Sequence, residues 1–216
     1  HGMKLNHVWF GAILGEDGKP FKTRSGEIIR LSGLLNEAEQ RAFDAVSEKN
    51  PNLPEEERRD IACVVGIGAI KYADLSGNRQ SDYVFNWDTM LALVGNTAPY
   101  LLYAFTRIRS IFRKLGDESL TRPESFALAQ PEELTLAKHL LRFGLVLELV
   151  IDECRPNYLC NYLYELAGHF ASFYENCPVL QSEGDIRTQR LALCDLTGQV
   201  LNTGLETLGI ETTGRM

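Results

Sequence analysis

The sequence has 216 residues, of which 44% are apolar and 24% charged, and its formal net charge is −7 at pH 7. A chain of this length and composition forms one large or two small globular domains and buries a core without covalent staples. The acidic charge argues against a protein that coats nucleic acid non-specifically, although a local basic patch can still bind phosphate. No apolar run approaches the ~18 residues of a membrane span, so we expect no membrane association.

Residues 7–14, with the sequence HVWFGAIL, have the composition of a β-strand, and Asp17-Gly18 is a turn signal. The sequence therefore predicts a β-hairpin over residues 7–30, with a return strand that begins at Phe21. The connecting stretch GEDGKPFKTRSGE contains three glycines and three cations. It lacks the spacing of a P-loop. Two interpretations are open: a solvated hairpin tip, or a flexible arm whose cations reach a polyphosphate.

Helical patterns dominate after residue 30. Ser32 is the predicted cap of a first helix with apolar residues at helical spacing. These residues are Leu34, Leu35, Ala38, Ala42 and Val46. Pro54 with the acids at 55–57 marks the start of a second helix. Its segment IACVVGIGAI is apolar all round, which predicts burial on most sides, and Gly66 and Gly68 would allow a close backbone approach.

A polar and aromatic connector at residues 75–87 precedes a third long helix. This helix is predicted to start at Pro99, with Asn96 or Thr97 as its cap, and to run to about Leu115, where Gly116 ends it. Further helices are predicted near 131–153, 157–175 and 185–208. The predicted fold class is mainly α, with an N-terminal β-hairpin followed by a helical body.

The helix at 99–115 has an apolar stripe and a polar stripe at helical spacing. The apolar stripe consists of Leu101, Phe105, Ile108, Phe112 and Leu115, and the polar stripe of Tyr103, Arg107, Ser110 and Lys114. Arg109 and Arg113 lie on a third flank. Residues 103–116 contain four cations and no acid, and an aromatic ring among cations suits single-stranded nucleic acid. A merely solvated helix face is the alternative.

The cysteines and histidines give no sign of a metal site or a catalytic triad. The five cysteines are an odd number without a Cys-x-x-Cys pair, and they are too isolated from histidine for a zinc site. His139 and His169 have no serine, cysteine or acid at a spacing that suggests a triad. Because the sequence also opens without a secretory segment, we expect reduced thiols, a cytoplasmic protein and no bound metal.

Four runs of the sequence resemble, in the same order, the C-terminal part of arginyl-tRNA synthetases, which are class I aminoacyl-tRNA synthetases. They are HVWFGAILGEDGKPFKTRSGE, GIGAIKYADLSGNRQSDYVFNWDTML, GNTAPYLLYAFTRIRSI and RLALCDLTGQVLNTGLETLGIETTGRM. The resemblance implies the end of a catalytic domain at 1–30, a helical region that contacts the tRNA stem at 31–94, and an anticodon-binding helical bundle at 95–216.

In the first run, FKTRSG resembles the family's Lys-Met-Ser-Lys-Ser loop, which stabilises ATP phosphates while the amino acid is adenylated. The resemblance assigns this catalytic role to Lys22, Thr23, Arg24 and Ser25, with Lys22 and Arg24 as the cations that bind ATP. Thr23-Arg24 replaces the serine-lysine of the family pattern. ATP with Mg²⁺ would be a substrate, and no tightly bound cofactor is expected.

Arginine tRNA is the partner that the resemblance implies, through its anticodon loop and stem. Spacing suggests Tyr103, Arg107, Arg109 and Lys114 as contacts, and the resemblance adds Asn96, Tyr100, Tyr174 and Met216. The His-x-Gly-His signature of the family's nucleotide-binding half is absent from the sequence. We therefore expect a monomeric part of an arginine–tRNA ligase that is inactive without the N-terminal catalytic half. A free-standing tRNA-binding module and an unrelated helical scaffold are the alternatives.

Overall fold

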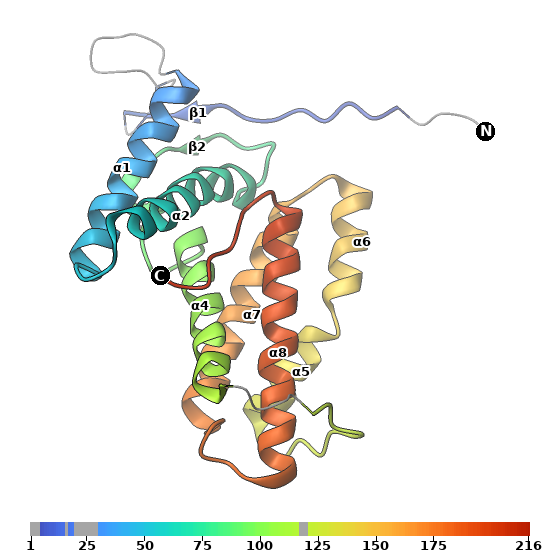
Figure 1. The fold of residues 1–216 in the computed structure, drawn as a ribbon. Coiled ribbons are helices and arrows are strands. Elements are labelled where there is room, and N and C mark those ends of the chain that lie inside the picture. Colours follow the sequence, from blue (N-terminus) through green and yellow to red (C-terminus); the bar gives the residue numbers. More distant parts are fainter. Residues whose placement is uncertain (1–4, 16, 20–29, 117–120) are drawn as a thin grey trace.

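The computed structural model describes residues 5–15, 17–19, 30–116 and 121–216. Within these ranges the chain is mainly α-helical, as the sequence predicts (Figure 1). The helices are α1 (Leu31–Lys49), α2 (Glu55–Ser76), α3 (Trp87–Met90), α4 (Ala98–Leu115), α5 (Pro131–Leu140), α6 (Phe143–Glu153), α7 (Asn157–Asn176) and α8 (Gly184–Thr207), and the strands are β1 (Ile13–Leu14) and β2 (Tyr83–Val84).

The described strand near the N-terminus has a partner that the sequence did not predict. β1 pairs in parallel with β2, so that Ile13 lies opposite Tyr83. The predicted strand at 7–14 is thus reduced to two residues, and the return strand predicted from Phe21 begins outside the described residues. The predicted turn is confirmed, because the Gly18 N–H donates to the Gly15 carbonyl over 2.9 Å. Gly18 has a φ of +70°, a region that favours glycine.

Helices α1 and α2 pack against one another, and α2 lies below the strands in the view of Figure 1. Arg30 is the N-cap of α1 and no side chain caps it, so the predicted cap at Ser32 is wrong. The predicted apolar face is buried at Leu34, Ala38, Ala42 and Val46. A Cβ atom at Gly66 would lie 2.6 Å from the Ala38 carbonyl oxygen, which explains the glycine at this crossing. Burial of α2 is less complete than predicted, since Cys63 is exposed.

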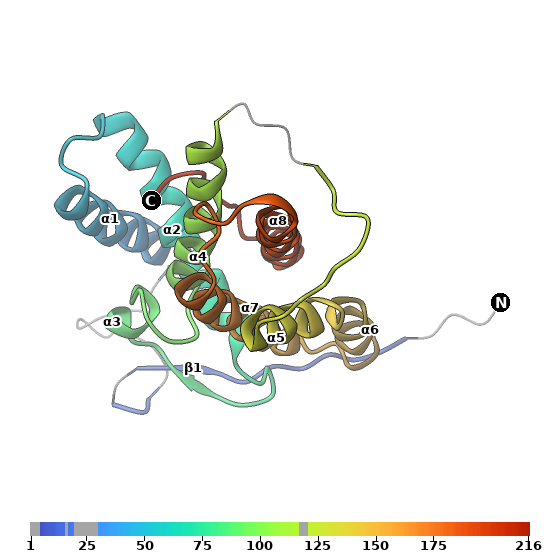
Figure 2. The same ribbon diagram turned by 90° about the horizontal axis from the view of Figure 1, so that it is seen from below.

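The remaining long helices form a bundle in which α4, α7 and α8 lie side by side and α5 and α6 flank them (Figure 2). The Thr97 hydroxyl accepts a hydrogen bond from the Tyr100 N–H over 3.3 Å, and Gly116 ends the helix with a φ of +68°. The predicted cap at Thr97 and the predicted end at Gly116 are therefore confirmed, and the helix begins at Ala98, one residue before the predicted Pro99. The helical region predicted at 131–153 consists of two helices, α5 and α6, which meet at residues 141–142.

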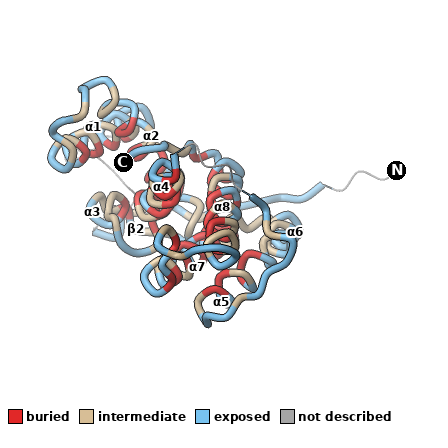
Figure 3. Tube along the Cα trace, turned by 60° about the horizontal axis from the view of Figure 1, so that its bottom comes forward, coloured by how far each residue is buried: buried red, intermediate tan, exposed pale blue. Residues whose placement is uncertain are grey.

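One apolar core joins α1 and α2 to the bundle (Figure 3). Val46 and Val65 belong to the same cluster as Leu101, Leu163 and Leu201. The Tyr72 hydroxyl adds a polar link, because it lies 2.6 Å from Asn96 Oδ1 and 2.9 Å from the Cys160 carbonyl oxygen. The core is thus continuous across residue 94, although the boundaries predicted at 30 and 94 stay predictions. Among the described residues, no helix is both apolar and long enough for a membrane span.

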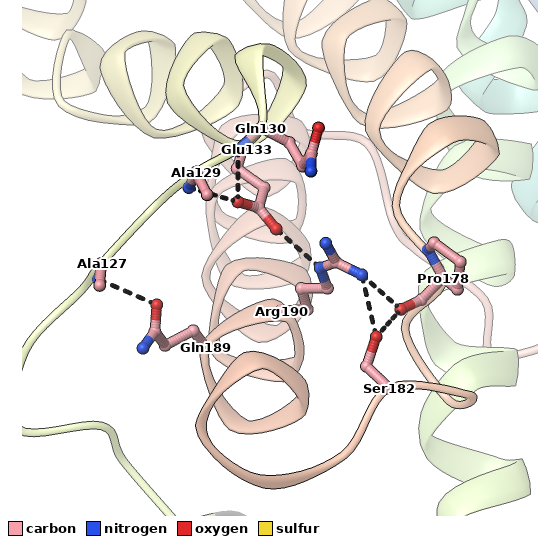
Figure 4. A network of polar contacts seen from close by, with 8 residues as sticks. All are labelled: Ala127, Ala129, Gln130, Glu133, Pro178, Ser182, Gln189 and Arg190. Atoms are coloured by element: carbon pink, nitrogen blue, oxygen red, sulfur yellow. Dashed lines mark hydrogen bonds and ion pairs between the residues drawn. The ribbon is translucent and has the colours of Figure 1, made fainter.

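A buried ion pair fastens the end of the bundle that lies farthest from the strands. Arg190 Nε on α8 donates to Glu133 Oε1 on α5 over 2.7 Å (Figure 4). The other carboxylate oxygen accepts from the backbone N–H groups of Ala129 and Gln130, each over 3.0 Å. Arg190 Nη1 also donates to the Pro178 carbonyl oxygen. The Arg190 guanidinium thus connects the start of α5 to the turn before α8.

Candidate nucleic-acid interface

The residues predicted to form the catalytic loop lie outside the described residues: Lys22, Thr23, Arg24 and Ser25, of which Lys22 and Arg24 are the predicted ATP contacts. The described start of the loop is the turn at 15–18, where the Gly15 N–H also donates to the Lys19 carbonyl over 2.8 Å. The geometry that bears on function is therefore that of α4 and its neighbours.

Helix α4 turns its apolar stripe toward α2, α7 and α8 and its polar stripe outward. Leu101, Ile108 and Leu115 are buried, whereas the Tyr103 ring is 41% exposed. Lys114 lies on the same face as Tyr103, at the far end of the helix, and is exposed. Eleven residues of helix separate them, a distance of about 17 Å. The polar stripe thus offers a cation and an aromatic ring over several turns.

Arg107 lies between two tyrosine rings on this face. Its guanidinium carbon is 5.3 Å from the centroid of the Tyr103 ring and 5.1 Å from that of the Tyr174 ring on α7. Nη2 also lies 3.3 Å from the Tyr103 hydroxyl oxygen. Cation–π contacts of this kind fix the plane of a guanidinium without using all of its N–H donors. The structure therefore brings together three of the predicted residues into one cation–aromatic cluster.

A second aromatic pair lies one turn closer to the start of α4. The rings of Tyr100 and Tyr164 meet edge to face with their centroids 5.6 Å apart. Asn96 Nδ2 donates to Asn161 Oδ1 over 3.0 Å at the same helix end. Burial and the nearby Tyr164 raise the pKa of Tyr100 and outweigh the opposing effect of Arg107, so its hydroxyl stays a hydrogen-bond donor at neutral pH.

Tyr164 and Asn161 were not among the predicted contacts, and the pattern of α7 contains a signal for them. Asn161, Tyr164 and Gly168 follow one another at steps of three and four, which places them on one side of the helix. Tyr164 is 37% exposed, and a Cβ atom at Gly168 would meet no atom within 4 Å. The tyrosine therefore has open space beside it.

The C-terminus lies beside the exposed tyrosine of α4. Met216 and Tyr103 line an apolar cavity of about 300 Å³ between α1, α2 and α4. The other lining residues are Ala42, Ala45, Val46, Lys49, Asn50, Val65, Leu91, Leu93 and Pro99. Two arginines hold the terminal segment: Arg113 donates to the Gly214 carbonyl, and Arg215 lies 3.5 Å from a Glu57 carboxylate oxygen. The predicted contact Met216 is thus brought next to Tyr103.

Arg109 is separated from this group. It lines a different depression, of about 280 Å³, together with Asp195, Gln199 and Asn202 of α8. Six residues of helix separate it from Tyr103, a rotation of about 240° around α4. The structure therefore joins Asn96, Tyr100, Tyr103, Arg107, Tyr174 and Met216 on one side of the molecule and places Arg109 on another.

Comparison with protein families gives two matches along the chain. Residues 101–216 match the DALR anticodon binding domain, and residues 1–87 match the catalytic domain of class I (R) tRNA synthetases. Helix α4 from Leu101 onward and the whole bundle after it fall in the first match, and the strands β1 and β2 fall in the second.

Curated relatives and solved structures agree with these matches. The chain is 56% identical to an arginine–tRNA ligase of Chromobacterium violaceum, covering 97% of this chain and 36% of the relative, and 54% identical to one of Proteus mirabilis, covering 99% and 37%. The arginyl-tRNA synthetase of Thermus thermophilus superposes with a TM-score of 0.85 at 30% identity, covering 96% of this chain and 35% of that one. The chain thus spans little more than a third of the length of the relatives it matches.

Proposed function

The chain belongs to the DALR anticodon-binding domain family, with the end of a class I arginyl-type catalytic domain before it, and we propose that it supplies tRNA recognition to an arginine–tRNA ligase. The ligase as a whole would attach arginine to its tRNA with ATP as a substrate. Arginine tRNA is the proposed partner. The observation that carries this proposal is the cluster in which Arg107 lies between Tyr103 and Tyr174.

This cluster has the chemistry that a single-stranded RNA loop requires. The exposed ring of Tyr103 and the half-buried ring of Tyr174 would offer stacking surfaces for unpaired bases, and the guanidinium between them would neutralise a phosphate. The cavity beside Tyr103 and Met216 is apolar and, at about 300 Å³, large enough for one base that has left its stack. Lys49 and Asn50 line the same cavity and supply polar groups for a base edge.

The ATP loop is a second part of the proposal. Lys22 and Arg24 would stabilise charge on the phosphates of ATP and its Mg²⁺ during adenylate formation. The proposal rests on their sequence pattern and on the match of residues 1–87 to a synthetase catalytic domain. We expect the 216-residue chain alone to make no arginyl-adenylate, because the His-x-Gly-His signature is absent from it. Arginine-dependent pyrophosphate exchange by the purified chain would refute this.

Filter-binding titrations of two variants test the RNA contacts. We expect Tyr174→Ala to weaken binding of arginine tRNA more than binding of an anticodon-swapped tRNA, with a loss of ~1–3 kcal/mol for one unstacked base. Arg107→Ala should weaken both tRNAs alike and lower the salt slope by about one, as the loss of one phosphate contact does. Arg109→Ala is the matched control, since it removes the same charge from another side of the same helix.

The result that contradicts the base-contact role is an equal loss for both tRNAs in Tyr174→Ala. A control variant Arg109→Ala that behaves like Arg107→Ala would contradict the assignment of the interface to this side of α4. Mixing the chain with arginine, ATP, tRNA and a separately produced amino-terminal part of the ligase distinguishes the ligase from a free-standing tRNA-binding module. Aminoacylation that needs both parts supports the ligase.

A further inference from the structure

Helix α6 exposes an apolar stripe to solvent. None of its eleven residues is buried, and its inner side contacts α7. Leu145 is 66% exposed and Leu149 43%, and Leu141, one turn before Leu145, is 83% exposed. Residues four apart lie on one face of a helix, so Leu145 and Leu149 form an exposed row on α6, and Leu141 precedes this row at the junction with α5. The solvent-facing side of a surface helix is normally polar, so a row of large apolar side chains there marks a contact site.

A second exposed apolar group lies in the extended segment before β1. Leu5 is 84% exposed, Val8 45%, Trp9 52% and Phe10 81%. The segment passes over the carboxyl end of α6 (Figures 1 and 2). Arg79 joins the two, because its Nε donates to the Cys154 carbonyl oxygen over 2.8 Å and its Nη1 donates to the Trp9 carbonyl oxygen. The segment therefore adjoins the carboxyl end of α6, the helix that carries the leucine row.

The space between these elements is also incompletely filled. A cavity of about 560 Å³ is lined by Val8 and Phe10 of the segment and by Cys154 and Pro156 after α6. The parallel pair β1–β2 beside it has two residues in each strand. Parallel strands are found in larger sheets that are covered on both faces. Exposed apolar side chains, an unfilled cavity and a short parallel strand pair thus occur together here, as at a surface that another protein segment covers.

We propose that the amino-terminal part of the synthetase catalytic domain binds to the exposed row of α6 and to the segment at 5–10. A helix of the anticodon-binding domain would then form part of the interface with the catalytic domain. This rests on the proposed function. The segment lies within the match to the class I catalytic domain, and almost two thirds of the length of the Chromobacterium violaceum relative lies outside its match to this chain. Glu148 and Asp152 flank the leucine row and are exposed, so the docked surface is expected to be apolar with basic groups at its rim.

Photo-crosslinking in a joined ligase tests the proposal. The unmatched amino-terminal part of the Chromobacterium violaceum enzyme is fused ahead of this chain, and a benzophenone side chain replaces Leu145. The matched control carries it at Leu196 of α8, which is 44% exposed. We expect crosslinks within one molecule from position 145 to the amino-terminal part, and none from position 196. Equal yields at the two positions would overturn the proposal.

Two measurements on the 216-residue chain itself address the other occupants of the surface. A dimer in sedimentation equilibrium that Leu145→Gln abolishes would assign the row to a second copy and overturn the proposal. A loss of tRNA affinity in Leu145→Gln like that in Tyr174→Ala would assign it to RNA and also overturn it. We expect a change of less than about twofold in the tRNA dissociation constant, as for an ordinary surface substitution. Absence of tRNA binding by the unaltered chain would refute the proposed function and leave the crosslinking result standing.

Discussion

Replacing Glu133 by alanine removes one partner of the buried ion pair between α5 and α8. Glu133 is 5% exposed and Arg190 9%, so the guanidinium left behind cannot be fully rehydrated without opening the end of the bundle. The variant also leaves the N–H groups of Ala129 and Gln130 without the carboxylate oxygen that caps the start of α5. We expect Glu133→Ala to lower the free energy of unfolding substantially.

The geometry sets the size of this effect. Removing one partner of a buried ion pair costs ~3–5 kcal/mol, a large share of the ~5–15 kcal/mol that stabilises a typical domain. In the double variant Glu133→Leu with Arg190→Met, both charges leave together, so we expect the loss to shrink to about 1 kcal/mol, the usual cost of a lost helix cap. Glu37→Ala is the matched control. It breaks an ion pair with Arg41 whose side chains are 49% and 44% exposed, and we expect a loss below ~1 kcal/mol.

The pH dependence of the same variant gives an independent signature. Burial acts to raise the pKa of Glu133, but hydrogen bonds from Gln130, Arg190 and Ala129 outweigh it and hold the pKa below the ordinary carboxyl value of 4.5. A carboxyl group with a lowered pKa in the folded state stabilises the fold above the unfolded pKa, and this contribution disappears as the pH falls below 4.5. The difference in stability between the natural chain and Glu133→Ala should therefore narrow under acid conditions.

Urea unfolding followed by circular dichroism at pH 7 and pH 4 measures both effects. A loss in Glu133→Ala no larger than in Glu37→Ala would refute the assignment of the pair as a buried stabilising contact. A double variant as unstable as the single one would refute the account based on an uncompensated charge. The same samples should keep their tRNA affinity at pH 7 under native conditions, because neither Glu133 nor Arg190 belongs to the cluster of Tyr103, Arg107 and Tyr174.

Two further predictions concern the helix crossings. Gly66→Ala should lower the free energy of unfolding by ~1–3 kcal/mol, because its Cβ would meet the Ala38 carbonyl oxygen at 2.6 Å. Gly33→Ala, with open space around the new Cβ, should raise the free energy of unfolding by up to ~1 kcal/mol. Equal effects of the two substitutions in urea unfolding would contradict the close approach at Gly66. Burial and the nearby His169 lower the pKa of His139, and they outweigh the opposing effects of the Tyr162 carbonyl and Glu165. The unfolded histidine therefore binds a proton more readily than the folded one, so the free energy of unfolding should fall as the pH drops below 6.5. We expect a smaller fall in His139→Gln. An unchanged pH slope in that variant would contradict the assignment.

Local sequence determined the ends and faces of several helices. Thr97 and Gly116 bound α4 because a cap hydroxyl and a residue with positive φ act on groups within three or four residues. The row of apolar residues in α1 and the polar stripe of α4 follow from helical periodicity in the same way. Gly66 predicted a close backbone approach, although the sequence alone did not identify α1 as the helix that approaches.

Contacts between distant residues were decided by the tertiary structure. The strand at 13–14 pairs with Tyr83–Val84, seventy residues along the chain, because the α1–α2 pair returns the backbone to its side. Tyr174 contacts Arg107 and Tyr164 contacts Tyr100 because α4 and α7 pack against one another. Arg109 lies outside this cluster because its angle around α4 turns it toward α8. Periodicity and capping report forces within one turn of a helix. The partners of a strand, a buried charge or an aromatic ring depend on which surfaces exclude water together, and that is settled only when the whole core packs.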